Sequence, residues 1–274
     1  MFMAEYFISG FGLISPTLAK ALEIPAGQRI WPASSFSLVA GAVLLPFSRI
    51  ADVWGSYRVF IAGLFWFAIW SLVCGFSQNY TMLIIFRAIQ GFGPAAFLPS
   101  GVMLLGSIYR PGPRKNLVFS LYGALSPVGF FAGILSSGIT DQYLSWRWYF
   151  WIGGIILFVV APLALLAAPQ ELVLTKDSRM DWWGVCTLVP GLLLIVYALT
   201  DSAHTARGWS APQIYVTFIL GCLCLLIAVY LEGWVAEQPL LPADLFQTSC
   251  MVPLLVSLFL SFGVFGIYLI YAGF

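Results

Sequence analysis

Charged side chains are scarce in this sequence of 274 residues. Only 8% of the residues are charged and 61% are apolar, whereas a soluble domain has about 25% and about 45 to 50% respectively. A water-exposed surface cannot be built from this composition. All of the charged residues except Glu5 and Arg87 fall in seven short segments, which are 20–29, 49–58, 110–115, 141–147, 171–181, 201–207 and 232–244.

Histidine and paired cysteines are also nearly missing, which removes most catalytic and metal sites. His204 is the only histidine, so neither an H-E-x-x-H zinc site nor a Ser-His pair supported by a second histidine can be assembled. The five cysteines include no C-x-x-C pair and lie in or beside apolar runs, where cysteine packs as a small hydrophobe. We therefore predict neither an enzyme nor a bound cofactor or metal. A net charge of +1 also excludes a basic face for nucleic acid.

Apolar runs fill the space between the charged segments, and most are long enough to cross a hydrocarbon layer about 30 Å thick. They predict an all-α polytopic protein embedded in the lipid bilayer. The side of the membrane that holds residues 49–58 receives more lysines and arginines than the other side, which predicts a cytoplasmic N-terminus. The nine predicted spans are about 3–19, 31–48, 59–76, 80–106, 117–139, 148–168, 183–199, 213–231 and 251–271.

The longest polar insert, residues 169–181, follows the sixth span and predicts a domain boundary. We expect residues 1–168 to form one six-helix bundle with the fifth span inside it. Residues 169–232 would be two inserted helices, and residues 233–274 the start of a second bundle. Because nine spans leave that second bundle almost empty, we expect the chain to be incomplete.

The segment Ser48-Arg49-Ile50-Ala51-Asp52-Val53-Trp54-Gly55-Ser56-Tyr57-Arg58 follows the second span. It resembles the signature loop G-x-x-x-D-x-x-G-x-R/K-R/K of the major facilitator superfamily, with Ser48 in place of the first glycine. The resemblance implies a gating loop in which Asp52, Gly55 and Arg58 take part in a cytoplasmic charge network. The alternative is an ordinary solvated cytoplasmic loop, since positive charge is expected there anyway.

The fourth span contains Arg87-Ala88-Ile89-Gln90-Gly91-Phe92-Gly93, which resembles the superfamily's fourth-helix pattern R-x-x-Q-G-x-G. Arg87 lies seven residues after Tyr80, about 10 Å inside the helix. Arginine at such depth costs about 2.5 to 3.5 kcal/mol on insertion scales, so it should face the bundle interior as a proton-relay or anion-binding group. The alternative is an arginine that extends to the outer interface.

The fifth span has a proline in its interior and glycines four residues apart. Pro127 should kink the helix, and Gly129 and Gly133 form a small-xxx-small face for close packing. Drug antiporters of the superfamily have G-P-x-x-G-G here, which this segment matches only in the proline and loosely in the glycines. A packing role and an antiport role therefore both stay open.

Three further segments resemble the fourteen-helix drug/proton antiporter branch of the superfamily, and fungal aminotriazole-resistance transporters most of all. They are 145–152 (SWRWYFWI), 179–184 (RMDWWG) and 239–242 (PLLP). The resemblance implies alternating-access transport of a small organic or toxic solute, coupled to protons, in the plasma membrane or alternatively the vacuolar membrane. The expected pathway residues are Arg87, Gln90, Tyr122, Ser126, Tyr6 and Ser9. The rival hypothesis is a truncated membrane protein that transports nothing; the oligomeric state stays open.

Overall fold

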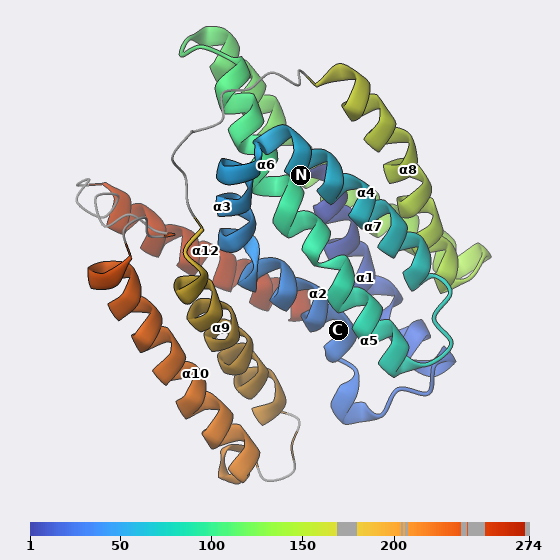
Figure 1. Cartoon of the computed structure of the whole chain (residues 1–274). Helices are drawn as coiled ribbons and strands as arrows, with labels where there is room; N and C mark the ends of the chain where they lie inside the picture. Colours follow the sequence, from blue (N-terminus) through green and yellow to red (C-terminus); the bar gives the residue numbers. More distant parts are fainter. Residues whose placement is uncertain (169–179, 204, 206–207, 237–239, 241–249, 272–274) are drawn as a thin grey trace.

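The computed structural model describes residues 1–168, 180–203, 205, 208–236, 240 and 250–271, without the side chains of 267–271 (Figure 1). Helices occupy all nine predicted spans, and the described residues contain no strand. The α-helices are α1 (Phe2–Ala21), α2 (Trp31–Ala42), α3 (Leu44–Trp54), α4 (Ser56–Cys74), α5 (Tyr80–Gln90), α6 (Phe92–Ile108), α7 (Pro113–Tyr143), α8 (Trp146–Ala167), α9 (Trp182–Ser202), α10 (Pro212–Tyr230) and α12 (Met251–Tyr271). Short 3₁₀ turns cover Ala26–Gln28 and Gly208–Ser210, and a π-helical turn covers Leu231–Val235.

Length and hydropathy identify which described helices can cross a membrane. Six pass, with α5 and α6 taken together as Tyr80–Ile108, and a seventh is obtained if the bent pair of α2 and α3 counts as one span. Since lipid offers no hydrogen bonds to the backbone, helices that satisfy their own peptide groups are the form that such segments take. The protein is an integral, multi-pass membrane protein.

Two of the predicted spans are broken near their middle. α2 and α3 meet at 43° around Val43, and Pro46 has no N–H to donate to the carbonyl of Ala42 four residues earlier. Pro94 has the same effect on the carbonyl of Gln90, where α5 ends. Residues 49–58 were predicted to form a loop, and this prediction is wrong. They are almost entirely helical, because α3 continues to Trp54 and α4 starts at Ser56.

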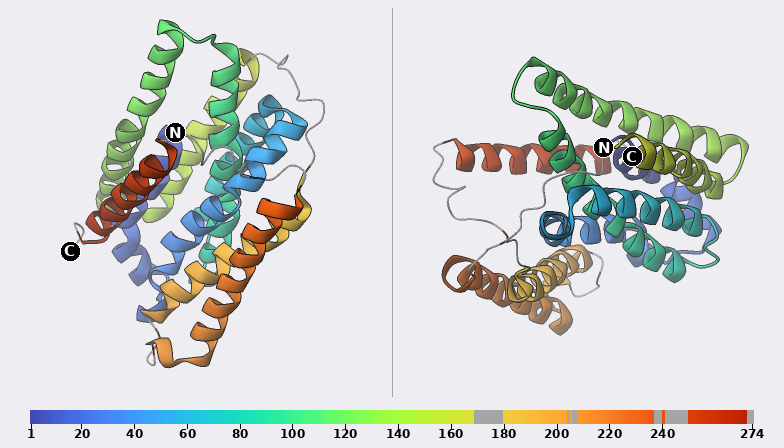
Figure 2. Two further views of the ribbon diagram at one scale, coloured as in Figure 1. Left: turned by 90° about the vertical axis from the view of Figure 1, so that its left-hand side faces the viewer. Right: turned by 45° about the horizontal axis from the view of Figure 1, so that its top comes forward.

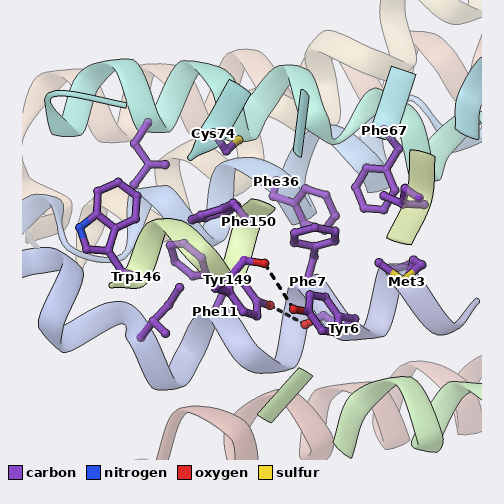
Figure 3. Close-up of a cluster of buried hydrophobic side chains, with 14 of the residues drawn as sticks. Met3, Tyr6, Phe7, Phe11, Phe36, Phe67, Cys74, Trp146, Tyr149 and Phe150 are labelled. Carbon is purple, nitrogen blue, oxygen red and sulfur yellow. Dashed lines mark hydrogen bonds between the residues drawn. The ribbon is translucent and has the colours of Figure 1, made fainter. Parts of the chain in front are cut away.

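The main core lies between α1, α4 and α8 and consists largely of aromatic rings (Figure 3). Phe7, Phe67, Tyr149 and Phe150 are completely buried there, and Tyr6 is almost so. Phe7 contacts rings on both neighbouring helices, with centroids 5.1 Å from Phe67 and 6.2 Å from Phe150. Rings of this size bury large apolar areas, so the cluster holds the first half of the chain together.

The expectation that the fifth span lies inside the bundle is wrong. α7 packs mainly on α1, and only 11% of its most apolar window is buried. Its buried residues are small or hydroxylated and follow one line along the helix: Gly129, Gly133, Ser137 and Thr140. The large apolar side chains lie on its other faces, so α7 stands at the edge of the bundle that the described residues form.

α9 and α10 lie side by side at one edge of the molecule, apart from the aromatic core (Figures 1 and 2). Their buried residues recur every seven positions, at Gly184, Gly191 and Ala198 on α9 and at Ile214, Gly221 and Ala228 on α10. The pair contacts α2, where the rings of Trp31 and Tyr197 are 5.5 Å apart. α12 approaches α1, and its Phe265 ring lies 5.6 Å from Phe130 of α7. The division of the chain into three domains stays a prediction.

Candidate functional site

The site is centred on Arg87, in the last turn of α5. The helix begins at Tyr80 because the side chain of Asn79 accepts a hydrogen bond from the backbone N–H of Met82 at 2.8 Å. The guanidinium then lies about two turns inside, and Arg87 is 1% exposed. An arginine that extended to the interface would be hydrated there, so this burial contradicts the alternative of a snorkelling side chain and confirms the expected inward orientation.

Neutral groups supply the hydrogen-bond acceptors of Arg87. Its Nε donates to the carbonyl of Pro32 on α2 at 3.1 Å, and its Nη1 donates to Oε1 of Gln90 at 2.9 Å. Gln90 in turn donates through Nε2 to the hydroxyl of Ser71 on α4 at 2.8 Å, and the Cys74 thiol lies 3.7 Å from Gln90 Oε1. The predicted pair Arg87 and Gln90 therefore forms one buried network that joins α2, α4 and α5.

Aromatic faces surround the rest of the guanidinium. Its carbon lies 4.4 Å from the ring centres of Phe11 and Phe36 and 5.9 Å from that of Phe150. Cation–π attraction is worth about 0.5 to 2 kcal/mol per contact. Within the described ranges, no carboxylate forms an ion pair with Arg87 and no three potential metal ligands gather. The arrangement therefore presents a fixed positive charge that no neighbouring anion neutralises.

Tyr6 and Ser9 form a second buried group, on α1. The hydroxyl of Tyr6 donates to the carbonyl of Tyr149 at 3.3 Å, the hydroxyl of Tyr149 donates to the carbonyl of Tyr6, and their rings stack 5.1 Å apart (Figure 3). Ser9 donates to the carbonyl of Phe130 on α7 at 2.8 Å. Phe150 links this group to Arg87, since its ring is 5.4 Å from that of Tyr149. These contacts join α1 to α7 and α8.

Tyr122 and Ser126 lie on α7 and are only partly buried. Neither Tyr122 nor Ser126 takes part in the Arg87 network. The predicted pathway residues therefore fall into three separate groups. Glu5 was missing from the predicted set, although the sequence held a signal for it as one of two charged residues outside the seven polar segments.

The predicted gating residues lie around a one-residue connection between two helices. Gly55 alone separates α3 from α4, with φ +97° and ψ 131°, a conformation that residues with a Cβ rarely adopt. Asp52 Oδ2 lies 3.6 Å from Nη1 of Arg49, one turn earlier on α3. Arg58 is exposed in the first turns of α4. Arg49 was not among the predicted gating residues, although its i,i+3 spacing from Asp52 is that of helix neighbours.

The glycines of α7 allow α1 to approach closely. A Cβ on Gly129 would overlap the backbone of Phe2, and a Cβ on Gly133 would overlap the backbone of Tyr6 and the hydroxyl of Ser9. α7 continues through Pro127 without a break. The two glycines therefore pack as a small-residue face would.

Two of the three antiporter-like segments contain residues with a clear structural role at the start of a helix. Trp146 of the 145–152 segment is 5% exposed and belongs to the core. In the 179–184 segment, Asp181 caps α9 by accepting a hydrogen bond from the N–H of Gly184 at 3.1 Å. Arg179, and all of the 239–242 segment except Leu240, lie outside the described residues.

Comparisons with known proteins agree with the superfamily that the sequence motifs resemble. A family model described as Major Facilitator Superfamily matches residues 1–274. The chain is 39% identical to a low affinity ammonium transporter of Saccharomyces cerevisiae over 89% of its length and 49% of that protein's. It is 33% identical to the aminotriazole resistance protein of the same yeast, over 93% and 48%. Identity to the efflux pump terJ of Aspergillus terreus is 34%, over 94% and 51%. The chain thus spans about half the length of these relatives.

Proposed function

Since the chain belongs to the major facilitator superfamily, we propose that this protein is a secondary transporter that moves a small organic or toxic solute by alternating access. The transport is proton-coupled export, and the N-terminus is cytoplasmic. The plasma membrane is the proposed location, with the vacuolar membrane as the alternative. Relatives named for ammonium transport, aminotriazole resistance and efflux support a small, nitrogen-containing solute.

The observation that carries the proposal is the burial of Arg87 among neutral partners. A charge at this depth is costly to insert, and a hydrophobic side chain of similar volume is often as stable or more stable at a buried site. The charge is therefore proposed to serve transport. A fixed cation there attracts an anionic solute and disfavours a proton or a cationic solute nearby. Glu5, the acidic residue in the first turn of α1, is the proposed proton acceptor.

Arg87→Met and Arg87→Lys in the full-length protein test this role. The first keeps the volume without the charge, and the second keeps the charge but cannot donate from both Nε and Nη. We expect Arg87→Met to reach the membrane with its melting temperature within a few degrees of wild type and to lose aminotriazole resistance and proton-dependent solute flux. Arg87→Lys should retain part of the activity. Wild-type resistance and flux in Arg87→Met at normal surface expression would contradict the role.

The rival proposal is a membrane protein without transport activity of its own. This proposal is favoured for residues 1–274 because they match only about half the length of the two yeast relatives. Alternating access needs two repeats that move around a site between them. We expect a protein of these 274 residues, purified and placed in vesicles, to insert without catalysing flux of ammonium or aminotriazole. Saturable flux above that of empty vesicles would show that these residues suffice.

A further inference from the structure

Three cations gather where α6 ends and α7 begins, at one end of the bundle (Figure 1). Arg110 and Arg114 are exposed. Lys115 is held in place, since its Nζ donates to the carbonyl of Gly106 at 2.9 Å and lies 5.8 Å from the ring centre of Phe119. Two arginines are therefore available to an external partner beside a lysine that is already anchored.

The charge of this cluster is not balanced locally. Over the part of the chain that the structure describes, none of the three cations forms an ion pair. The first turn of α7 contains no acidic residue, and the positive end of the helix dipole lies there as well. The positive charges of Arg114 and Lys115 and the positive end of the helix dipole therefore all favour the binding of an anion at this position.

An apolar strip continues from the cluster along α7. Leu117, Leu121, Leu125 and Val128 follow at spacings of four, four and three residues, and they are 61%, 57%, 47% and 54% exposed. This spacing places them on one face of the helix. Arg114 precedes Leu117 by three residues and Leu121 by seven. It therefore lies on the same face of α7, at the end of the strip that is nearest the start of the helix. A ligand with an anionic head and a long apolar tail matches this pattern, whereas a free anion would leave the strip unused.

We propose that the cluster of Arg110, Arg114 and Lys115 together with the strip of Leu117, Leu121, Leu125 and Val128 binds one anionic glycerophospholipid of the membrane leaflet at this end of the bundle. The two arginines bind the phosphate and the acidic headgroup, Lys115 adds attraction from its fixed position, and an acyl chain lies along the strip. The site is separate from the Arg87 network and does not depend on the proposed transport.

Native mass spectrometry of the purified chain, exchanged into phosphatidylserine or phosphatidylcholine, tests the proposal. We expect one phosphatidylserine to be retained in preference to phosphatidylcholine. Arg110→Gln combined with Arg114→Gln should weaken that preference by up to roughly 30-fold, from about a factor of five for each cation near an anionic surface. Lys20→Gln combined with Arg29→Gln is the control. It also removes two exposed cations, but these lie away from the cluster, in the last turn of α1 and in the connection that follows it.

Three results would overturn the proposal. One is equal retention of phosphatidylserine by wild type and the Arg110/Arg114 variant. Another is an equal loss in the Lys20/Arg29 control, which would indicate attraction by charge anywhere on the chain. The last is complete displacement of the lipid by excess inorganic phosphate, which would indicate a site for a free anion. Melting temperatures of both variants near that of wild type would show that the comparison is between folded proteins.

Discussion

At Arg87, neutral groups take the place of the counterion that a buried charge usually has. Hydrogen bonds to a charged group contribute about 1.5 to 3 kcal/mol each, and Arg87 makes two of them, to Pro32 and Gln90. The faces of Phe11 and Phe36 add cation–π attraction. Together these contributions are larger than the insertion cost of about 2.5 to 3.5 kcal/mol. Arg87 is thus held stably inside the bundle as a cation, and its charge remains available to an anionic solute.

Gly55 is the residue at which a single methyl group should have a large effect. Its φ of +97° lies where a Cβ is strained, so Gly55→Ala should destabilise the protein by about 1 to 3 kcal/mol. The matched control is Gly123→Ala in α7, where an added Cβ meets no atom within 4 Å, and where alanine should be neutral or stabilising by up to about 1 kcal/mol.

Thermal unfolding of both variants in the same detergent would check the difference. A melting temperature for Gly55→Ala equal to that of wild type would show that the connection between α3 and α4 relaxes at no cost, and that this glycine is not needed for the turn.

At the scale of elements, the two broken spans pack against each other. A Cβ on Gly91, at the break between α5 and α6, would lie 2.7 Å from the carbonyl oxygen of Phe36 and 3.1 Å from the amide nitrogen of Ala40. Both belong to α2, shortly before its own break at Val43. This close approach brings the end of α5 against α2, and so places Arg87 within reach of Pro32.

The interface of α1 with α7 depends on glycine in the same way. Gly133→Leu should force the helices apart, since the new side chain would meet the backbone of Tyr6 and the hydroxyl of Ser9. Overpacking of this kind costs about 1 to 3 kcal/mol. Gly138→Leu on the same helix is the control, because its Cβ would meet only the Leu13 side chain, at 3.7 Å.

We expect a lower melting temperature for Gly133→Leu and a value near wild type for Gly138→Leu. If the two variants unfold together, α7 is not tightly packed on α1, and its edge position would depend on some other contact.

At the scale of the whole molecule, the first six spans bury their own charge. Arg87 is enclosed by side chains from α1, α2, α4, α5 and α8, so no second bundle is needed to shield it from lipid. The pair of α9 and α10 contacts this unit through α2. The first six spans therefore shield Arg87 without help from the other described helices, whereas the proposed solute site lies between two bundles and needs a second one.

The proposed topology gives opposite positions to the two ends of α9. Its 21 residues span about 31 Å, the thickness of the hydrocarbon layer. In a background without cysteine, Met180→Cys should be labelled by an impermeant maleimide from the cytoplasmic side, and Ser210→Cys only from the outside. Labelling of Met180→Cys from the outside alone would reverse the orientation.

Much of the candidate site was visible in the sequence. Counting from Tyr80 placed Arg87 deep in its helix, and its cost there predicted that it faces inward. Its partners were not predictable, because Pro32 is 55 residues away in the sequence and Phe11 and Phe150 lie still farther. The grouping of Tyr6 and Ser9 apart from Tyr122 and Ser126 was also invisible, since polarity and depth do not specify which helices meet.

The sequence by itself determined that the chain is helical, that it is embedded in a membrane, and roughly where each span begins and ends. These properties are local, because each helix satisfies its own backbone groups in lipid. The placement of α7 at the edge, the breaks in two spans and the neutral surroundings of Arg87 were decided only by tertiary structure. A helix that is apolar on every face carries no periodic signal for its buried side, so the close packing of glycines against neighbouring backbones selects that side.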